Sequence, residues 1–287
     1  MEIKQIDLYE NFGIPRSEGA SGGYLICYIH EQAEEFCIGR QRPAMIIAPG
    51  GAYCYISQRE GEPVALAFLD RGYNSFVLKY SIRTAKHPTQ LIEGAMAVAY
   101  VKSHAAELYV DPDHVAMAGF SAGGHLAAML ATIYADSVVK ETLGDSAYLA
   151  RPDAVVLSYP VITSDRHASH GGSFDNLTGD NKGLREYLSL EKRVDKDSVP
   201  AFIWCTADDD SVPSPNSMLL AYAYYEARVP FELHIFETGV HGLALANRET
   251  TVIGSDWLGI HRIDDRIAEW VDMAAAWLKR RGFEIIG

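Results

Sequence analysis

A serine set among glycines is the residue in this chain whose surroundings most favour covalent chemistry. Residues 119–124 read Gly-Phe-Ser-Ala-Gly-Gly, which places Ser121 in a G-x-S-x-G pattern. An apolar stretch typical of a strand precedes the pattern, and a stretch rich in Ala, Leu and Met that is typical of a helix follows it. This order predicts a sharp strand-to-helix turn that exposes a nucleophilic hydroxyl, and glycines relieve crowding there. The alternative is an ordinary turn that contains a serine by chance.

Acyl chemistry at a serine also needs hydrogen-bond donors aimed at the oxyanion that forms. The backbone N–H of Ala122, directly after the serine, is the first expected donor. Residues 46–53 read Ile-Ile-Ala-Pro-Gly-Gly-Ala-Tyr, so the N–H of Gly51 or Ala52 is the expected second donor. Pro49 and Ala52 stand where a His-Gly-Gly-Gly loop has His and its third Gly, and both changes leave a backbone donor in place. Alone, this loop would read as a plain Gly-Gly turn.

A nucleophilic serine needs a histidine to take its proton and a carboxylate to hold that histidine, in the chain order serine, acid, histidine. His241 follows an expected strand at 232–236 and precedes Gly242, a loop position from which an imidazole can reach the serine. His234 lies inside the strand and His261 in a polar stretch, so we expect His241 to be the base. The acid should follow the expected strand at 201–205.

Three consecutive aspartates, Asp208, Asp209 and Asp210, come directly after that strand. Side chains that alternate along an extended loop would send only one or two of them toward His241. The others could cap the next helix. The spacing from Asp209 to His241 leaves room for one helix and one strand, and Asp208 is the alternative acid.

Alternating strands and helices must position these residues. Short apolar runs without period-two alternation are typical of strands buried on both faces of a parallel sheet. The first 40 residues lack a convincing helix and are expected to add antiparallel edge strands. The pattern predicts a doubly wound, mostly parallel α/β sheet with helices on both faces. The expected strands are 44–48, 75–79, 115–119, 154–158, 201–205 and 232–236, and the expected helices are 62–70, 90–108, 122–134, 217–227 and 264–281.

The 287 residues contain no internal repeat and no low-complexity linker, so a single domain over 1–287 is expected. Residues 161–200 fit the alternation poorly and carry a charged helical piece at 184–193. We interpret them as an inserted, substrate-shaping segment above the sheet. The expected substrate-binding residues are Tyr53, beside the Gly-Gly loop, and His170 and Phe174 in this segment. Residues 257–261 offer a further aromatic face for a sugar or an anchor for the last helix.

Charge and cysteine usage exclude several function classes. The net charge of −13 disfavours nucleic acid or an anionic membrane as the main partner. The chain has no apolar stretch long enough to span a membrane and no recognisable secretory signal, so a cytoplasmic location is expected. No C-x-x-C motif occurs, and the spacing of Asp165, His167 and His170 matches no ligand pattern. No metal and no cofactor are therefore expected. The sequence leaves a homo-oligomer open.

Together these motifs resemble the α/β-hydrolase superfamily, in particular its small esterase branch of acetyl-xylan-esterase-like and dienelactone-hydrolase-related proteins. The resemblance covers most of the chain from Pro43 onward. In that branch the acid stands four residues before the Pro of a D-x-x-V-P pattern, which selects Asp209 through Pro213. Ser121 departs from the cysteine of dienelactone hydrolases and points to oxygen esters. The motifs that carry the resemblance are residues 49–53, 59–63, 119–125, 158–162, 208–213, 232–236 and 241–242.

The resemblance implies a cofactor-free serine carboxylesterase that removes short acyl groups, acetyl above all, from xylo-oligosaccharides or related sugars. Its partner would be a small-molecule acyl ester. Two alternatives stay open. One is a serine peptidase of the prolyl-oligopeptidase type, although the sequence offers no propeller-sized segment to filter peptides. The other is a non-catalytic binding module on the same fold, which would have no need for Ser121, His241 and a carboxylate together.

Overall fold

The computed structural model describes residues 1–35, 39–251 and 263–286. Its central feature is a sheet with the strand order β1-β2-β4-β3-β5-β6-β7-β8. β2 pairs antiparallel with β1 and β4, and the other pairings in this sheet are parallel. This confirms the mostly parallel α/β sheet with antiparallel strands at one edge. The strands are β1 (Glu2–Asp7), β2 (Tyr24–Ile29), β3 (Arg42–Ala48), β4 (Asn74–Lys79), β5 (Val110–Phe120), β6 (Ala154–Ser158), β7 (Ala201–Thr206) and β8 (Phe231–Phe236).

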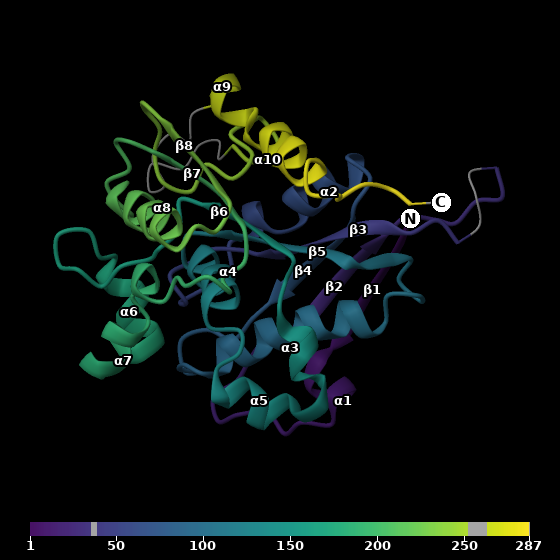
Figure 1. Cartoon of the computed structure of the whole chain (residues 1–287), viewed down its shortest axis with the longest axis horizontal. Coiled ribbons are helices and arrows are strands. Elements are labelled where there is room, and N and C mark those ends of the chain that lie inside the picture. Colours follow the sequence, from purple (N-terminus) through teal and green to yellow (C-terminus); the bar gives the residue numbers. More distant parts are fainter. Residues whose placement is uncertain (36–38, 252–262, 287) are drawn as a thin grey trace.

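Helices cover both faces of the sheet, as expected (Figure 1). On one face α2, α9 and α10 pack over a core in which the rings of Trp204 and Trp270 stack with centroids 5.3 Å apart. On the other face α1, α3, α4, α5 and α8 enclose a second core. Burial of these apolar side chains is the main force that holds the layers together. The helices are α1 (Leu8–Phe12), α2 (Glu62–Asp70), α3 (Thr89–Ser103), α4 (Ala122–Thr132), α5 (Ser137–Leu143), α8 (Pro215–Ala227), α9 (Asp265–Ala268) and α10 (Trp270–Lys279).

Helix boundaries show where periodicity misleads. The helix predicted at 90–108 ends at Ser103, and the one predicted at 264–281 is divided at Glu269 into α9 and α10. The short helices α1 and α5 have no counterpart in the prediction, because helices of 5 and 7 residues are too brief to show a period. The carboxylates of Asp7 and Asp136 cap their first turns and define where they begin.

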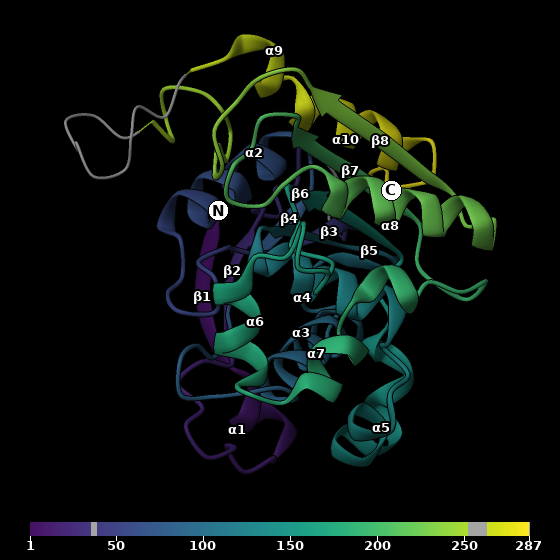
Figure 2. The same cartoon turned by 90° about the vertical axis from the view of Figure 1, so that its left-hand side faces the viewer.

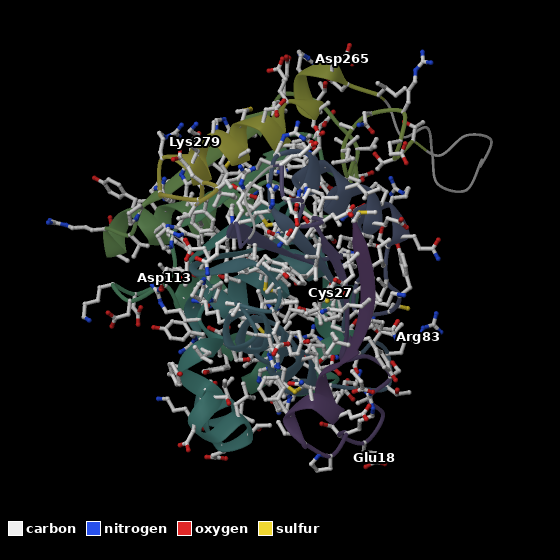
Figure 3. The ribbon with its side chains drawn as sticks, turned by 90° about the vertical axis from the view of Figure 1, so that its right-hand side faces the viewer. Glu18, Cys27, Arg83, Asp113, Asp265 and Lys279 are labelled. Carbon is white, nitrogen blue, oxygen red and sulfur yellow. The ribbon has the colours of Figure 1, made fainter. Side chains whose placement is uncertain are left out.

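Most charged side chains lie on the outside of the molecule, and a few carboxylates, such as Glu60, Glu93 and Asp209, are buried. Glu18, Asp113, Asp265 and Lys279 project from the ribbon, whereas Cys27 on β2 is fully buried (Figure 3). Of the helices in the described ranges, none combines the length and the apolar character needed to cross a bilayer.

Residues 161–200 form a compact helical segment, with α6 (Gly171–Thr178), α7 (Lys182–Tyr187) and the 3-10 turn η3 (Leu190–Lys192). Figure 2 shows α6 and α7 together on the side that faces the viewer. His125, buried on α4, holds the segment: its Nε2 donates to the carbonyl of Leu188, 2.9 Å away, and its Nδ1 accepts from the Tyr53 hydroxyl, also at 2.9 Å. That one domain carries this segment as an insertion stays a prediction.

This buried imidazole predicts how stability depends on pH. Burial lowers the pKa of His125 from its ordinary 6.5 to about 4. Between these values the unfolded chain binds a proton that the folded protein does not, so stability falls as pH falls. We expect His125 to contribute a loss of about 2–3 kcal/mol in the free energy of unfolding between pH 7 and pH 4.5.

Urea denaturation of the wild type and His125→Gln at both pH values measures this contribution. Gln does not titrate, so the variant should lose less stability on acidification, even though its stability at pH 7 is itself lower. If the free energy of unfolding fell by the same amount in both proteins, the loss would not come from His125 and the prediction would be wrong.

Candidate active site

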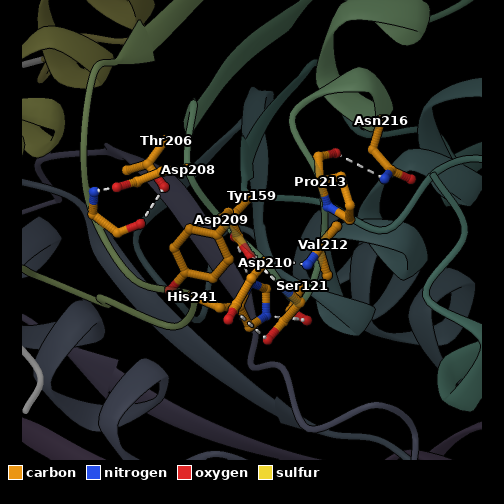
Figure 4. Close-up of polar contacts among 12 residues, drawn as sticks. Ser121, Tyr159, Thr206, Asp208, Asp209, Asp210, Val212, Pro213, Asn216 and His241 are labelled. Carbon is orange, nitrogen blue, oxygen red and sulfur yellow. Dashed lines mark hydrogen bonds and ion pairs between the residues drawn. The ribbon is translucent and has the colours of Figure 1, made fainter. Parts of the chain in front are cut away.

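Three loops at the carboxyl edge of the parallel strands bring Ser121, Asp209 and His241 together (Figure 4). Ser121 lies between β5 and α4, Asp209 follows β7 and His241 follows β8. Parallel strands end at one edge of a sheet, where ligand sites of such folds lie. The Oγ of Ser121 is 2.9 Å from Nε2 of His241, and Nδ1 of His241 is 2.7 Å from Oδ2 of Asp209.

The backbone at Ser121 is held in an unusual conformation, with φ 53° and ψ −116°. A non-glycine residue adopts this region only where its surroundings impose it. A Cβ added at Gly119 would collide with the carbonyl of Gly123, and one added at Gly123 would collide with that of Ala48. The two glycines therefore allow β5, β3 and α4 to approach closely enough to force Ser121 into the turn.

The three aspartates have different surroundings. Asp209 is buried, and its Oδ1 accepts from the N–H groups of Ser211 and Val212 at 3.0 and 2.9 Å, which leaves Oδ2 for His241. A carboxylate at Nδ1 favours the tautomer whose Nε2 accepts the serine proton. Asp210 is exposed and lies 3.3 Å from the Ser211 hydroxyl.

Asp208 braces the loop that leads to His241. Its Oδ1 accepts from the N–H of Gly239 at 2.6 Å, while the Thr206 hydroxyl donates to the Gly239 carbonyl at 2.7 Å. The expectation that the remaining aspartates cap the next helix is wrong, because α8 begins after Ser214 without a side-chain cap. Asp208 and Asp210 instead bond within the loops around the site.

The expected oxyanion donors surround Ser121. Gly51 and Ala52 line the cavity beside it and have positive φ values of 126° and 54°. Ala122 is the first residue of α4, where N–H groups have no partner within the helix. Within the described ranges, no hydrogen bond engages the N–H of Gly51, Ala52 or Ala122. These three groups are therefore free to meet an anion at the positive end of the helix dipole.

A cavity of about 260 Å³ opens over the serine. Most of the lining residues carry polar side chains, and His170, from residues 161–200, is one of them. His170 Nδ1 lies 2.8 Å from the Ser173 hydroxyl, and burial, with a smaller effect of His241, lowers its pKa. The lining residues are Gly51, Ala52, Tyr55, Ser57, Arg59, Glu60, Ser121, His170, Ser211, His241 and Gly242.

Two expected substrate-binding residues lie elsewhere. Tyr53 and Phe174 are each 1% exposed and pack around His125 instead of lining the cavity. The positive φ of 57° at Tyr53 belongs to a turn that directs its ring inward. Tyr55, which is 53% exposed, occupies the cavity wall that we expected Tyr53 to form. Residues 257–261, expected as an aromatic face, lie outside the described residues.

Sequence reasoning also missed Arg59 and Glu60 as lining residues. They belong to residues 59–63, a stretch noted only for its resemblance, and no local signal indicates that it lines the same cavity as Ser121. Asp165 accepts from the backbone N–H of His167, and the described part of the chain contains no group of three side chains suited to a metal ion.

Known proteins are similar to this chain in sequence. The chain is 38% identical over 242 residues to an endo-1,4-beta-xylanase B from Butyrivibrio fibrisolvens, covering 82% of this chain and 36% of that protein. It is 28% identical over 225 residues to an acetylxylan esterase from Xylanibacter ruminicola, covering 76% and 43%. The chain thus spans less than half the length of these two relatives.

Solved structures match over nearly the whole chain. An acetyl ester-xyloside bifunctional hydrolase from Caldicellulosiruptor lactoaceticus superposes with a TM-score of 0.79 at 35% identity, covering 98% of this chain and 97% of that one. The carboxylesterase Cest-2923 from Lactobacillus plantarum superposes with a TM-score of 0.82 at 28% identity over the full length of both. These similarities confirm the α/β-hydrolase fold and support a carboxylic ester hydrolase. Because the BD-FAE family model matches residues 37–224, well over half of the sequence, the chain belongs to the BD-FAE family of α/β-hydrolases.

Proposed function

We propose that this protein is a serine esterase that hydrolyses short acyl esters, acetyl above all, on xylo-oligosaccharides or related sugars. The observation that carries the proposal is the hydrogen-bonded chain from Ser121 through His241 to buried Asp209, which opens onto a small polar cavity. The Ser121–His241 and His241–Asp209 pairs both lie within hydrogen-bond distance, as proton transfer requires.

In the proposed acylation step, Oγ of Ser121 attacks the ester carbonyl while Nε2 of His241 takes its proton. The carbonyl oxygen becomes an oxyanion that the N–H groups of Ala122 and of Gly51 or Ala52 stabilise. Asp209 stabilises the imidazolium through Nδ1. His241 then donates its proton to the alkoxide oxygen, so the alcohol leaves and an acyl-serine remains.

Deacylation repeats the same steps with water as the nucleophile. His241 takes a proton from water as the hydroxyl oxygen attacks the acyl carbon, and the same N–H groups stabilise the second oxyanion. Collapse of that intermediate breaks the bond to Ser121, whose oxygen recovers the proton from His241. The carboxylic acid leaves, and no group outside the chain and water takes part.

The size and polarity of the cavity favour a small acyl group and a polar alcohol. The cavity of about 260 Å³ is slightly smaller than the roughly 300–1,000 Å³ of typical small-molecule sites. Ser57, His170 and Arg59 are among its lining residues, and hydroxyl, imidazole and guanidinium groups suit sugar hydroxyls better than a lipid chain. The names of the relatives, a xylanase, an acetylxylan esterase and an acetyl ester-xyloside hydrolase, support the same substrate class.

A substrate panel tests this proposal. We expect acetate release from p-nitrophenyl acetate and acetylated xylo-oligosaccharides, slower turnover of p-nitrophenyl octanoate, and none of an aminoacyl anilide. Ser121→Ala should lower kcat at least about 10³-fold, because the nucleophile is lost. Cleavage of the anilide would indicate a peptidase instead. No turnover by the wild type would favour a binding module.

A second comparison tests the acid. Asp209→Asn should lower kcat roughly 10⁴-fold, because the amide favours the wrong tautomer of His241. Asp208→Asn is the matched control. Its amide oxygen can still accept from the N–H of Gly239, so we expect this variant to keep most of the wild-type activity. Steady-state kinetics of the two variants on p-nitrophenyl acetate distinguish the residues. If only Asp208→Asn abolished turnover, Asp208 would be the acid.

A further inference from the structure

A second buried carboxylate, outside the proposed triad, lies in the wall of the same cavity. Glu60, at the end of the 3-10 turn η1 (Gln58–Glu60), is only 3% exposed. Its Oε2 accepts from the N–H of Gly50 at 2.8 Å, and its Oε1 accepts from the hydroxyl of Tyr159 at 2.7 Å. Both donors are neutral, so directed hydrogen bonds hold this carboxylate in place.

The first partner belongs to the loop that supplies the oxyanion donors. Gly50 packs directly on the turn at the nucleophile, since a Cβ added to it would lie 2.9 Å from the Phe120 carbonyl oxygen and 3.0 Å from Cβ of Ser121. Gly51 and Ala52 follow immediately. Any displacement of Gly50 would therefore move their N–H groups relative to Oγ of Ser121.

The second partner supports the histidine. The Tyr159 oxygen accepts from the N–H of Ala244 at 2.9 Å, and Ala244 lies three residues after His241. The Tyr159 ring lies against the imidazole of His241, with centroids 5.0 Å apart and planes at 69°. Tyr159 is 2% exposed and so has little freedom to move.

We propose that Glu60 is a positioning residue that, through Tyr159, fixes the oxyanion loop relative to the loop of the catalytic histidine. This inference rests on the proposed function. Glu60 has no part in proton transfer: it sets where the donors of Gly51 and Ala52 stand when the oxyanion forms. Small displacements of such groups cost large factors in rate, so a change at Glu60 should affect the transition state more than substrate binding.

Glu60→Gln tests the inference with almost no change in shape. Gln has one acceptor oxygen, so it cannot accept from both the Gly50 N–H and the Tyr159 hydroxyl, and one of the two hydrogen bonds is lost or must reverse its direction. Glu93→Gln is the matched control. Glu93 is also fully buried, and it accepts from the Tyr9 hydroxyl at 3.0 Å and the Ser81 N–H at 2.6 Å, but it does not line the cavity.

The readouts are kcat and KM for p-nitrophenyl acetate, the thermal unfolding midpoint, and the inhibition constant of an alkylboronic acid, which forms a tetrahedral adduct with a nucleophilic serine. For Glu60→Gln we expect kcat and boronate affinity to fall together by about 10²-fold, with KM nearly unchanged. Glu93→Gln should lower the unfolding midpoint and leave kcat and boronate affinity as in the wild type.

Equal behaviour of the two variants in kcat and boronate affinity would overturn the inference. If Glu60→Gln does not fold, Tyr159→Phe takes its place: it removes one partner of Glu60, and it should lower kcat and boronate affinity by the same factor. Unchanged boronate affinity in that variant would overturn the inference as well.

The wild type and Ser121→Ala separate this inference from the proposed function. If the wild type hydrolyses the ester and Ser121→Ala does not, the proposed function stands, and the Glu60 variants decide this inference alone. If the wild type neither hydrolyses the ester nor binds the boronic acid, the proposed function fails and the inference fails with it.

Discussion

The close approach of β5, β3 and α4 at Ser121 is the constraint on which the site depends. Gly119 and Gly123 lack a Cβ, so three backbones meet where a side chain would collide with a carbonyl. The backbone of Ser121 is thereby forced to positive φ, which directs Oγ toward His241. At the start of α4 the N–H of Ala122 has no hydrogen-bond partner among the residues that the structure describes. A less crowded turn would relax and lose both features.

Around this turn, buried carboxylates hold loops that carry little regular structure. Asp209 orients His241 while it accepts from its own loop. Glu60 holds the Gly-Gly loop through Gly50. Asp208, which is exposed, also anchors Gly239 two residues before His241. Buried carboxylates persist only where donors satisfy them. The donors here come from the loops that must stay in place, so satisfying each carboxylate also orders the proposed site.

Local signals predicted most of the fold. Strands buried on both faces read as continuous apolar runs, and β6 and α2 have the predicted bounds. Hydrophobic periodicity did not reveal where a helix ends, as α3 does at Ser103. It also did not reveal α1 and α5, which are too short for the pattern to repeat. Of the residues expected to bind substrate, His170 lines the cavity. Tyr53 was expected in the cavity wall, where the structure has Tyr55 instead. The sequence does not show that Tyr53 adopts a positive φ of 57°, in a turn that directs its ring inward.

By itself the sequence determined which types of residue can do chemistry and the order in which they occur: a serine among glycines, an acidic loop and a late histidine. Each of these features can be recognised from a few neighbouring residues and from the order in which the features follow along the chain. The resemblance already selected Asp209 among the three aspartates, whereas spacing alone left the choice open, and the tertiary structure shows Asp209 facing His241. Only the tertiary structure shows that Glu60 lines the same cavity as Ser121, from which 60 residues separate it. Such pairings depend on which loops meet at the edge of the sheet, and packing between distant segments sets that meeting.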